Sequence, residues 1–261
     1  MLRDSGLSVG IIVTTYNNIE ALRLVIQSIH QQTRLPQEII IADDGTNAVL
    51  SDYVGDLNEL IPIKHCWLPD IDFRAARSRN LAIMKTSSKY LIFIDGDCWL
   101  PPDFIKSHLS LASPNKIIAG GRSLLTKAKT DALLREYNFS IIQEELRKLK
   151  FRRLYLGPLR DKVFNSWRTV RSCNLGIFRD AVFETAGFDE SFIGWGKEDS
   201  DFILRCLNRG MLIRNGRFAT SVIHLWHESS SKFKLSRNLK LLENTLENHS
   251  INPTRSSLSF L

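Results

Sequence analysis

Short apolar runs alternate with helical segments over residues 1–100, and this alternation restricts the fold more than any other feature. The apolar runs cover residues 9–13, 38–42, 61–66 and 90–94, with 61–66 the weakest. Apolar side chains recur at helical spacing over residues 19–31 and 75–85. Runs this short are typical of buried strands. Strands that alternate with helices predict an α/β fold, a Rossmann-like, mostly parallel sheet flanked by helices.

The rest of the chain has a different pattern. Residues 128–171 are rich in Leu, Lys and Arg, which predicts one or two amphipathic helices inserted into the fold. We further expect strands over residues 174–178 and 221–223 and a helix over residues 199–209. The polar residues 229–261 predict a terminal helix with a loose tail. Together these patterns predict a single domain over residues 1–228, followed by that tail.

Composition narrows the class of protein. The 261 residues, 43% of them hydrophobic, can bury a substantial core. The net charge of +7 predicts an anionic partner: nucleic acid, acidic lipid or a phosphorylated substrate. Nucleic acid is the least favoured, because the chain lacks the aromatic-basic interleaving that stacking platforms use and its basic residues concentrate near one insert.

Targeting signals and cysteines give further expectations. We expect no secretory signal, because the stretch before the first strand is too short for one. No run approaches the roughly 18 apolar residues of a membrane span. The four cysteines lack CxxC spacing, which predicts free thiols in a cytoplasmic protein and no zinc site.

Polar clusters follow three of the predicted strands. Thr14 and Tyr16 follow the first, Asp44 the second, and Asp95 and Asp97 the fourth. Ligands of parallel sheets bind beyond the carboxyl ends of the strands, so these side chains predict a nucleotide-type site. Two carboxylates one residue apart suit Mg²⁺ or Mn²⁺. The alternative for each cluster is an ordinary polar turn.

Three arginines gather where the helix over residues 75–85 begins. Arg74, Arg77 and Arg79 lie within six residues, just before the fourth strand. Guanidinium groups bind diphosphates in fork geometry, and backbone amides at a helix start add to that attraction. The alternative is a solvated basic helix face.

An acidic helix start follows a tryptophan between two glycines. Trp195 lies between Gly194 and Gly196, and Glu198 and Asp199 follow. The indole can stack on a sugar, and a carboxylate here can take the proton of an attacking hydroxyl. The alternative is an ordinary acidic helix cap.

Two histidines follow the strand over residues 221–223. Either His224 or His227 can complete a metal site begun by Asp97. The sequence does not separate the two, and a core or surface histidine is the alternative for each.

These motifs, in this order, resemble a known family. The early set resembles the nucleotide half of family 2 glycosyltransferases of the GT-A fold: residues 13–17, 43–46, 79–80 and 95–97. The later set resembles the acceptor half shared with β-1,4-galactosyltransferases and chondroitin-polymerase-like enzymes: residues 173–178, 187–190 and 194–199. The resemblance implies a nucleotide-binding half over residues 1–100 and an acceptor-binding half over residues 101–228. One departure is Lys197, where galactosyltransferases usually have glycine.

The resemblance also implies roles for individual residues. Asp199 becomes the general base. The nucleotide is contacted by Thr14, Tyr16, Asp44, Arg74, Arg77, Arg79 and Asp95. The metal is held by Asp97 with Asp95 and by His227 or, less favoured, His224. The acceptor sugar is held by Trp195, Gly196 and Glu198.

The implied activity is an inverting, metal-dependent transfer of a hexose or N-acetylhexosamine. The donor is a UDP-sugar, the cofactor Mn²⁺ or Mg²⁺, and the acceptor a saccharide or a lipid-linked glycan. Such a step belongs to polysaccharide, capsule or lipopolysaccharide synthesis. The alternative is a non-catalytic nucleotide-sugar-binding subunit. The basic insert is expected either to touch the cytoplasmic face of an anionic membrane or to recognise a phosphorylated acceptor.

Overall fold

The computed structural model describes residues 6–46, 60–154, 166–228 and 231–260. A seven-stranded sheet in the order β3-β2-β1-β4-β8-β6-β9 forms its centre. Its strands are β1 (Val9–Thr15), β2 (Glu38–Asp43), β3 (Ile63–Trp67), β4 (Tyr90–Asp95), β6 (Lys116–Ala119), β8 (Asn174–Phe178) and β9 (Leu212–Asn215). Strands β1 to β4 run parallel, and β8 runs antiparallel to both neighbours. The predicted α/β fold with a mostly parallel sheet is confirmed.

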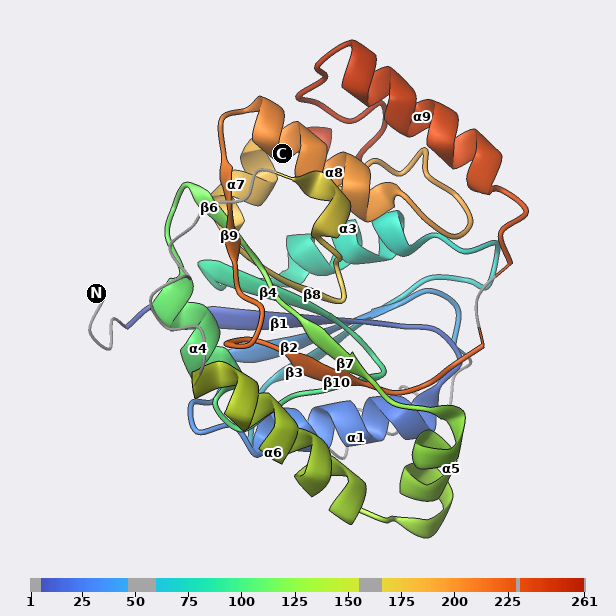
Figure 1. Ribbon diagram of the computed structural model, residues 1–261. Coiled ribbons are helices and arrows are strands. Elements are labelled where there is room, and N and C mark those ends of the chain that lie inside the picture. Colours follow the sequence, from blue (N-terminus) through green and yellow to red (C-terminus); the bar gives the residue numbers. More distant parts are fainter. Residues whose placement is uncertain (1–5, 47–59, 155–165, 229–230, 261) are drawn as a thin grey trace.

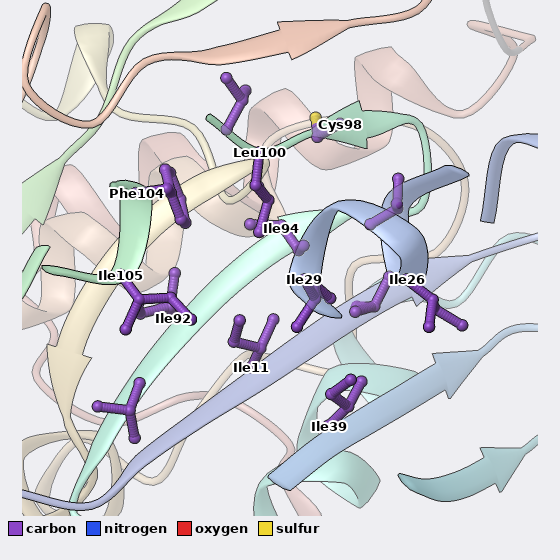
Figure 2. Packing of buried hydrophobic residues seen from close by; sticks show 14 of the residues in the cluster. Ile11, Ile26, Ile29, Ile39, Ile92, Ile94, Cys98, Leu100, Phe104 and Ile105 are labelled. Carbon is purple, nitrogen blue, oxygen red and sulfur yellow. The ribbon is translucent and has the colours of Figure 1, made fainter. Parts of the chain in front are cut away.

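Helices cover both faces of this sheet (Figure 1). One face packs against α1 (Ile19–His30) and α4 (Phe104–Leu111). Figure 2 shows Ile26 and Ile29 of α1 lying against Ile11 and Ile39 of the sheet. The other face packs against α3 (Ala75–Lys85), α7 (Arg179–Glu184) and α8 (Glu198–Asn208). Because alternate residues of each strand enter opposite clusters, both faces are buried, which explains the uninterrupted apolar runs.

A small second sheet closes one side of the domain. It joins β5 (Cys98–Trp99), β10 (Val222–His224) and β7 (Arg122–Leu124) in the order β5-β10-β7. The predicted insert forms α5 (Lys127–Glu136) and α6 (Ser140–Leu154), whose apolar faces pack against this sheet and α1. Residues 155–165 of the insert lie outside the described residues. Among the described helices, none combines the length and apolarity that crossing a membrane requires.

The predicted loose tail is wrong over the described residues. Helix α9 (Leu235–Glu247) packs through Leu242 against Phe192 and Leu204. Beyond it, Leu258 in the short 3-10 turn Ser257–Phe260 is buried in the cluster around α3 and α8. Gly187 permits this contact: its φ is +65°, and a Cβ there would approach the Leu258 Cδ1 to 2.3 Å. The chain end therefore completes the core.

A buried ion pair fixes α8 against its neighbours. The fully buried Arg205 Nε donates to Asp201 Oδ2 at 2.8 Å. Its two Nη atoms donate to the carbonyls of Thr185 and Gly187, each at 2.7 Å. Thr245 of α9 donates to the other Asp201 oxygen at 2.6 Å. One network thus links α7, α8 and α9, and Asp201 serves packing rather than a ligand.

Arg205→Met is expected to destabilise the protein by about 3–5 kcal/mol, because it leaves the Asp201 carboxylate buried without its cation. The free energy of unfolding from urea denaturation measures this loss. Arg209→Met, at the exposed end of the same helix, is the matched control and is expected to cost less than about 1 kcal/mol. Equal losses in the two variants would contradict the structural role of Arg205.

Candidate functional site

The buried guanidinium of Arg79 joins the two halves of the chain. Arg79 Nε donates to Thr14 Oγ1 at the end of β1, at 3.1 Å. Nη1 donates to Glu198 Oε1 at the start of α8, also at 3.1 Å, and Nη2 lies 3.5 Å from Asp95 Oδ1. The ring of Phe188 lies beneath, 5.4 Å from the guanidinium carbon. Arg79 thereby brings the predicted nucleotide and acceptor residues to one place.

Carboxylates crowd around this arginine. Burial raises the pKa of Asp95; Arg79 counteracts this, and the neighbouring Asp97 and Asp199 raise it further. Burial and Asp199 likewise raise the pKa of Glu198, again against the effect of Arg79. Asp95 Oδ1 and Glu198 Oε2 are buried without a hydrogen-bond partner among the described residues. Such a cluster is electrostatically unfavourable unless a cation or a donor-rich ligand completes it.

Asp97 and the two histidines form a candidate metal site that fits a divalent cation. His224 Nε2 lies 3.6 Å from Asp97 Oδ1, and His227 Nε2 lies 3.4 Å from Asp97 Oδ2. The Nδ1 atoms of His224 and His227 lie 2.7 Å from the carbonyls of Leu225 and Glu228. A carbonyl only accepts, so each Nδ1 carries the proton, and in a neutral ring Nε2 presents a lone pair to Asp97. Three electron-pair donors therefore converge where a cation would neutralise their repulsion.

The sequence did not reveal Cys98 as a neighbour of this site. Its Sγ lies 3.7 Å from Asp97 Oδ1, and together with His224 it places three potential ligand atoms within 4.8 Å of one another. Burial, and to a lesser degree the neighbouring Cys173, raises the pKa of the Cys98 thiol. The oxygen and nitrogen ligands suit Mg²⁺ or Mn²⁺ better than a thiol does. All four cysteines are unpaired and buried, as predicted for free thiols.

Two consecutive aspartates at the end of β2 have different surroundings. Asp43 is satisfied within the protein: His65 Nε2 lies 2.8 Å from its Oδ2, and the Thr46 amide donates to its Oδ1 at 2.8 Å. Asp44 accepts from the backbone amide of Arg74 through Oδ2, while its buried Oδ1 has no described hydrogen-bond partner. Burial raises the pKa of Asp44 to about 6. An unsatisfied oxygen in this position can accept a hydrogen bond from a ligand.

The remaining predicted nucleotide residues, Tyr16, Arg74 and Arg77, differ in their contacts with Asp44 and its neighbours. Tyr16 is exposed, and its hydroxyl lies 3.4 Å from both oxygens of Asp70, a residue that the sequence motifs missed. Arg74 Nε lies 3.8 Å from Asp44 Oδ1. Arg77 is half-buried, and no hydrogen bond or ion pair among the described residues joins it to the cluster; its buried Nε has no described hydrogen-bond partner.

The Trp195 loop adopts an unusual backbone. Gly194, Gly196 and Lys197 have φ values of +82°, +101° and +81°. Lys197 is thus a non-glycine residue in the left-handed region, a conformation that glycine adopts at a lower steric cost. The Gly196 carbonyl accepts from Asn238 Nδ2 of α9 at 2.9 Å. Trp195 remains 39% exposed, with Lys232 Nζ 5.6 Å from its ring centroid.

Asp199 uses only one of its two carboxylate oxygens in described hydrogen bonds. Its Oδ1 accepts from the Ser200 amide at 2.7 Å and from the Ser200 hydroxyl at 3.3 Å. Its Oδ2 accepts no hydrogen bond from the residues that the structure describes. Asp199 lies close enough to Asp95 and Arg79 for its charge to affect the pKa of both. The structure therefore places Asp97, Asp95 and Asp199 around one site.

Comparisons with known proteins agree with this arrangement. The chondroitin synthase of Escherichia coli is 25% identical over 231 residues, which cover 80% of this chain and 33% of that protein. The validoxylamine A glucosyltransferase of Streptomyces hygroscopicus subsp. limoneus is 23% identical over 77% of this chain and 48% of its own length. The chain thus spans about a third to a half of these relatives.

Solved structures share the fold. The structure of S. aureus TarS 1-349 in complex with UDP-GlcNAc superimposes with a TM-score of 0.66 at 12% identity, covering 93% of this chain and 67% of that one. GalNAc-T7 with UDP, GalNAc and Mn²⁺ gives a TM-score of 0.67 at 14% identity, covering 92% of this chain and 48% of that one. The predicted GT-A fold is confirmed.

Two known protein families match overlapping parts of the chain. The N-terminal domain of galactosyltransferase matches residues 160–228, the segment that carries the Trp195 loop, Glu198, Asp199 and both site histidines. Glycosyl transferase family 2 matches residues 10–186, which include the strand ends and Arg79. On the strength of that match, the chain belongs to glycosyl transferase family 2.

Proposed function

We propose that this chain transfers a hexose or N-acetylhexosamine from a UDP-sugar to a glycan acceptor, with inversion at the anomeric carbon. The contacts of Arg79 with Thr14, Asp95 and Glu198 carry the proposal. They hold the ends of β1 and β4, where we expect the nucleotide, against the acidic start of α8, where we expect the acceptor. Chondroitin synthase among the relatives and UDP-GlcNAc in the TarS structure support the substrate classes. Synthesis of a polysaccharide, capsule or lipopolysaccharide is the setting we propose.

The nucleotide is assigned to the carboxyl ends of β1, β2 and β4. Asp44 Oδ1, buried and unsatisfied, is positioned to accept a hydrogen bond from the base or the ribose. Thr14 lies near the end of β1 and Tyr16 follows that strand, and Arg74 and Arg77 each have a buried Nε without a described hydrogen-bond partner. We assign these residues, with Arg79, to the nucleotide. The division into halves over residues 1–100 and 101–228 stays a prediction.

A divalent metal would be held by Asp97 with Asp95, His227 and His224. The Mn²⁺ bound to GalNAc-T7 supports this assignment. When bound, the metal supplies neutralisation of the charge on the UDP leaving group. His224 is buried and His227 half-exposed, and both direct Nε2 to Asp97, so we propose that both contribute.

The acceptor is assigned to the start of α8. The half-exposed Trp195 ring offers a face for a sugar, and Glu198 Oε2 is free for a hydroxyl donor. The Gly196 backbone, held by Asn238, sets the position of the loop. Asp199 Oδ2 is the proposed base: it takes the proton as the acceptor oxygen attacks the anomeric carbon and the bond to UDP breaks. Attack opposite the leaving group inverts the configuration.

A non-catalytic nucleotide-sugar-binding subunit is the alternative function. Such a protein needs the nucleotide residues but not a free carboxylate at Asp199. The oxygen Asp199 Oδ2, which accepts no hydrogen bond from a described residue, therefore favours catalysis.

Asp199→Asn is expected to reduce turnover about 10²–10⁴-fold and to leave UDP affinity nearly unchanged, because only the base is lost. UDP release during incubation with a panel of UDP-sugars, Mn²⁺ and saccharide acceptors measures turnover, and calorimetric titration measures UDP binding. Asp180→Asn, an exposed aspartate on α7, is the control. Near-normal turnover in Asp199→Asn would refute the base. A wild-type protein that binds UDP but never releases it from any donor would favour the binding subunit.

Asp97→Ala is expected to weaken Mn²⁺-dependent UDP binding at least about 10–100-fold, since a metal ligand is removed. Calorimetric titration of UDP with Mn²⁺ and with EDTA gives both affinities. Asp180→Ala is the charge-matched control. If wild-type protein bound UDP equally well with Mn²⁺ and with EDTA, the metal assignment would fail.

We also propose that the insert contacts an anionic membrane at its periphery. Arg147 and Lys150 of α6 are exposed and have no carboxylate partner among the described residues, whereas Lys148 is paired with Glu144 and Glu145. Each basic residue near an anionic surface contributes about 1 kcal/mol of attraction. The double variant Arg147→Gln/Lys150→Gln is therefore expected to lower co-sedimentation with phosphatidylserine vesicles by roughly tenfold or more. Sedimentation that is independent of the phosphatidylserine content would remove this proposal.

A further inference from the structure

A pocket of about 440 Å³ that the proposed activity does not use lies next to the site. Four arginines line it: Arg122, Arg168, Arg171 and Arg217. The remaining lining residues are apolar or small, and none is acidic. These arginines come from β7, from the segment before β8 and from the turn before β10, so only the folded chain brings them together. We call this hollow the arginine pocket.

Two of the arginines are held in place by neutral groups. Arg171 Nη1 donates to the carbonyls of Arg168 and Val170, at 2.9 and 2.7 Å. The Arg168 guanidinium lies 4.6 Å from the Trp167 ring centroid. These contacts orient the guanidinium groups but neutralise no charge.

No described carboxylate pairs with any of the four. This contrasts with the two buried arginines Arg79 and Arg205, which pair with Glu198 and Asp201. Arg122 Nη1 instead reaches Cys173 Sγ, at 4.0 Å. Clustered guanidinium groups without anions repel one another, so the pocket is prepared for an anion that the chain itself does not supply.

The sheet places the arginine pocket beside the proposed reaction centre. Strand β8 begins where β4 ends, with Asn174 opposite Ile94, and β6 ends at Ala119 opposite Leu175. The pocket residues Cys173 and Gly120 therefore lie at the same sheet edge as Asp95, one and two strands away. Neighbouring strands are about 4.8 Å apart, so the separation is roughly 5–10 Å. Two buried cysteines lie between them: Cys98 Sγ is 3.7 Å from Asp97 Oδ1, and Cys173 Sγ is 4.0 Å from Arg122 Nη1. Cys173 is near enough to Cys98 to raise the pKa of its thiol.

This position separates the pocket from the donor nucleotide. The nucleotide residues follow β1, β2 and β4, whereas the pocket lies beyond β4 on the β8 and β6 side. A ligand there would approach Asp97 from the acceptor half. The planar fork of a guanidinium matches the oxygen pairs of carboxylate and phosphate.

We propose that the arginine pocket binds an oxyanionic substituent of the acceptor glycan, a uronic acid carboxylate or a phosphate, close to the hydroxyl that reacts. The inference rests on the proposed function and gives its acceptor a chemical class: an acidic glycan. The pocket selects the acceptor by charge, and Trp195 and Glu198 orient the sugar that receives the transfer.

The test compares Arg122→Gln and Arg217→Gln with Arg135→Gln, an exposed arginine of α5 outside the pocket. Three acceptors are used: a uronic acid oligosaccharide, a glycosyl phosphodiester oligomer, and a neutral oligosaccharide of matched length. For each pocket variant, the ratio of kcat/KM for the acidic acceptor to that for the neutral one is expected to fall roughly tenfold, through KM. The two acidic acceptors identify which oxyanion the pocket takes. Arg135→Gln is expected to leave the ratio unchanged.

A binding measurement makes the test independent of catalysis. The dissociation constant of the acidic oligosaccharide is measured without donor or metal, and it is expected to rise about tenfold in each pocket variant. If that rise occurs but no donor yields UDP, the pocket stands and the proposed function fails. If turnover is normal and neither the ratio nor the dissociation constant changes, the pocket assignment fails and the function stands. Loss of binding to phosphatidylserine vesicles with unchanged oligosaccharide binding would also overturn the inference.

Discussion

The ion pairs of Arg79 are the interaction on which the site depends. A guanidinium that is 3% exposed needs compensation for its lost hydration, and it finds this in Glu198 and Asp95. One partner is on β4 and the other on α8, which are far apart in the sequence. The same charge balance that permits burial of Arg79 therefore fixes the start of α8, and with it Asp199, beside the end of the central strands.

The nucleotide edge could be predicted from the sequence because parallel strands place their carboxyl ends together. The observed β1, β2 and β4 extend the apolar runs over 9–13, 38–42 and 90–94 by one or two residues, so Thr14, Asp44 and Asp95 had to converge. Helix α3 begins and ends as its spacing predicted, and α8 differs by one residue at each end. The length and the periodicity of their apolar residues were therefore enough to locate these strands and helices in the sequence.

Other features depend on contacts that local patterns do not encode. Asp43 and Asp44 are adjacent in the sequence, yet Asp43 is the last residue of β2 and contacts His65 of β3, whereas Asp44 lies beyond the strand and keeps one oxygen without a described hydrogen-bond partner. The strands β5 and β7, of two and three residues, are too short for periodicity to reveal; β10 was expected over residues 221–223 and is observed one residue later, and its pairing places His224 opposite Cys98. The tail is polar in sequence but packs through Leu258, which no pattern singles out.

Acidic and basic side chains lie in separate regions at the end of the sheet, one suited to the metal and the donor and the other to an acidic acceptor. On the β4 side, Asp95, Asp97 and Asp199 outnumber the buried cation Arg79, which favours a metal and a donor-rich ligand. On the β8 and β6 side, the four pocket arginines have no described anion. A cation beside the acidic cluster and an acidic glycan beside the arginines would each neutralise one side. Since Cys98 and Cys173 lie between the two regions, a cation bound at one would strengthen the attraction of an anion to the other.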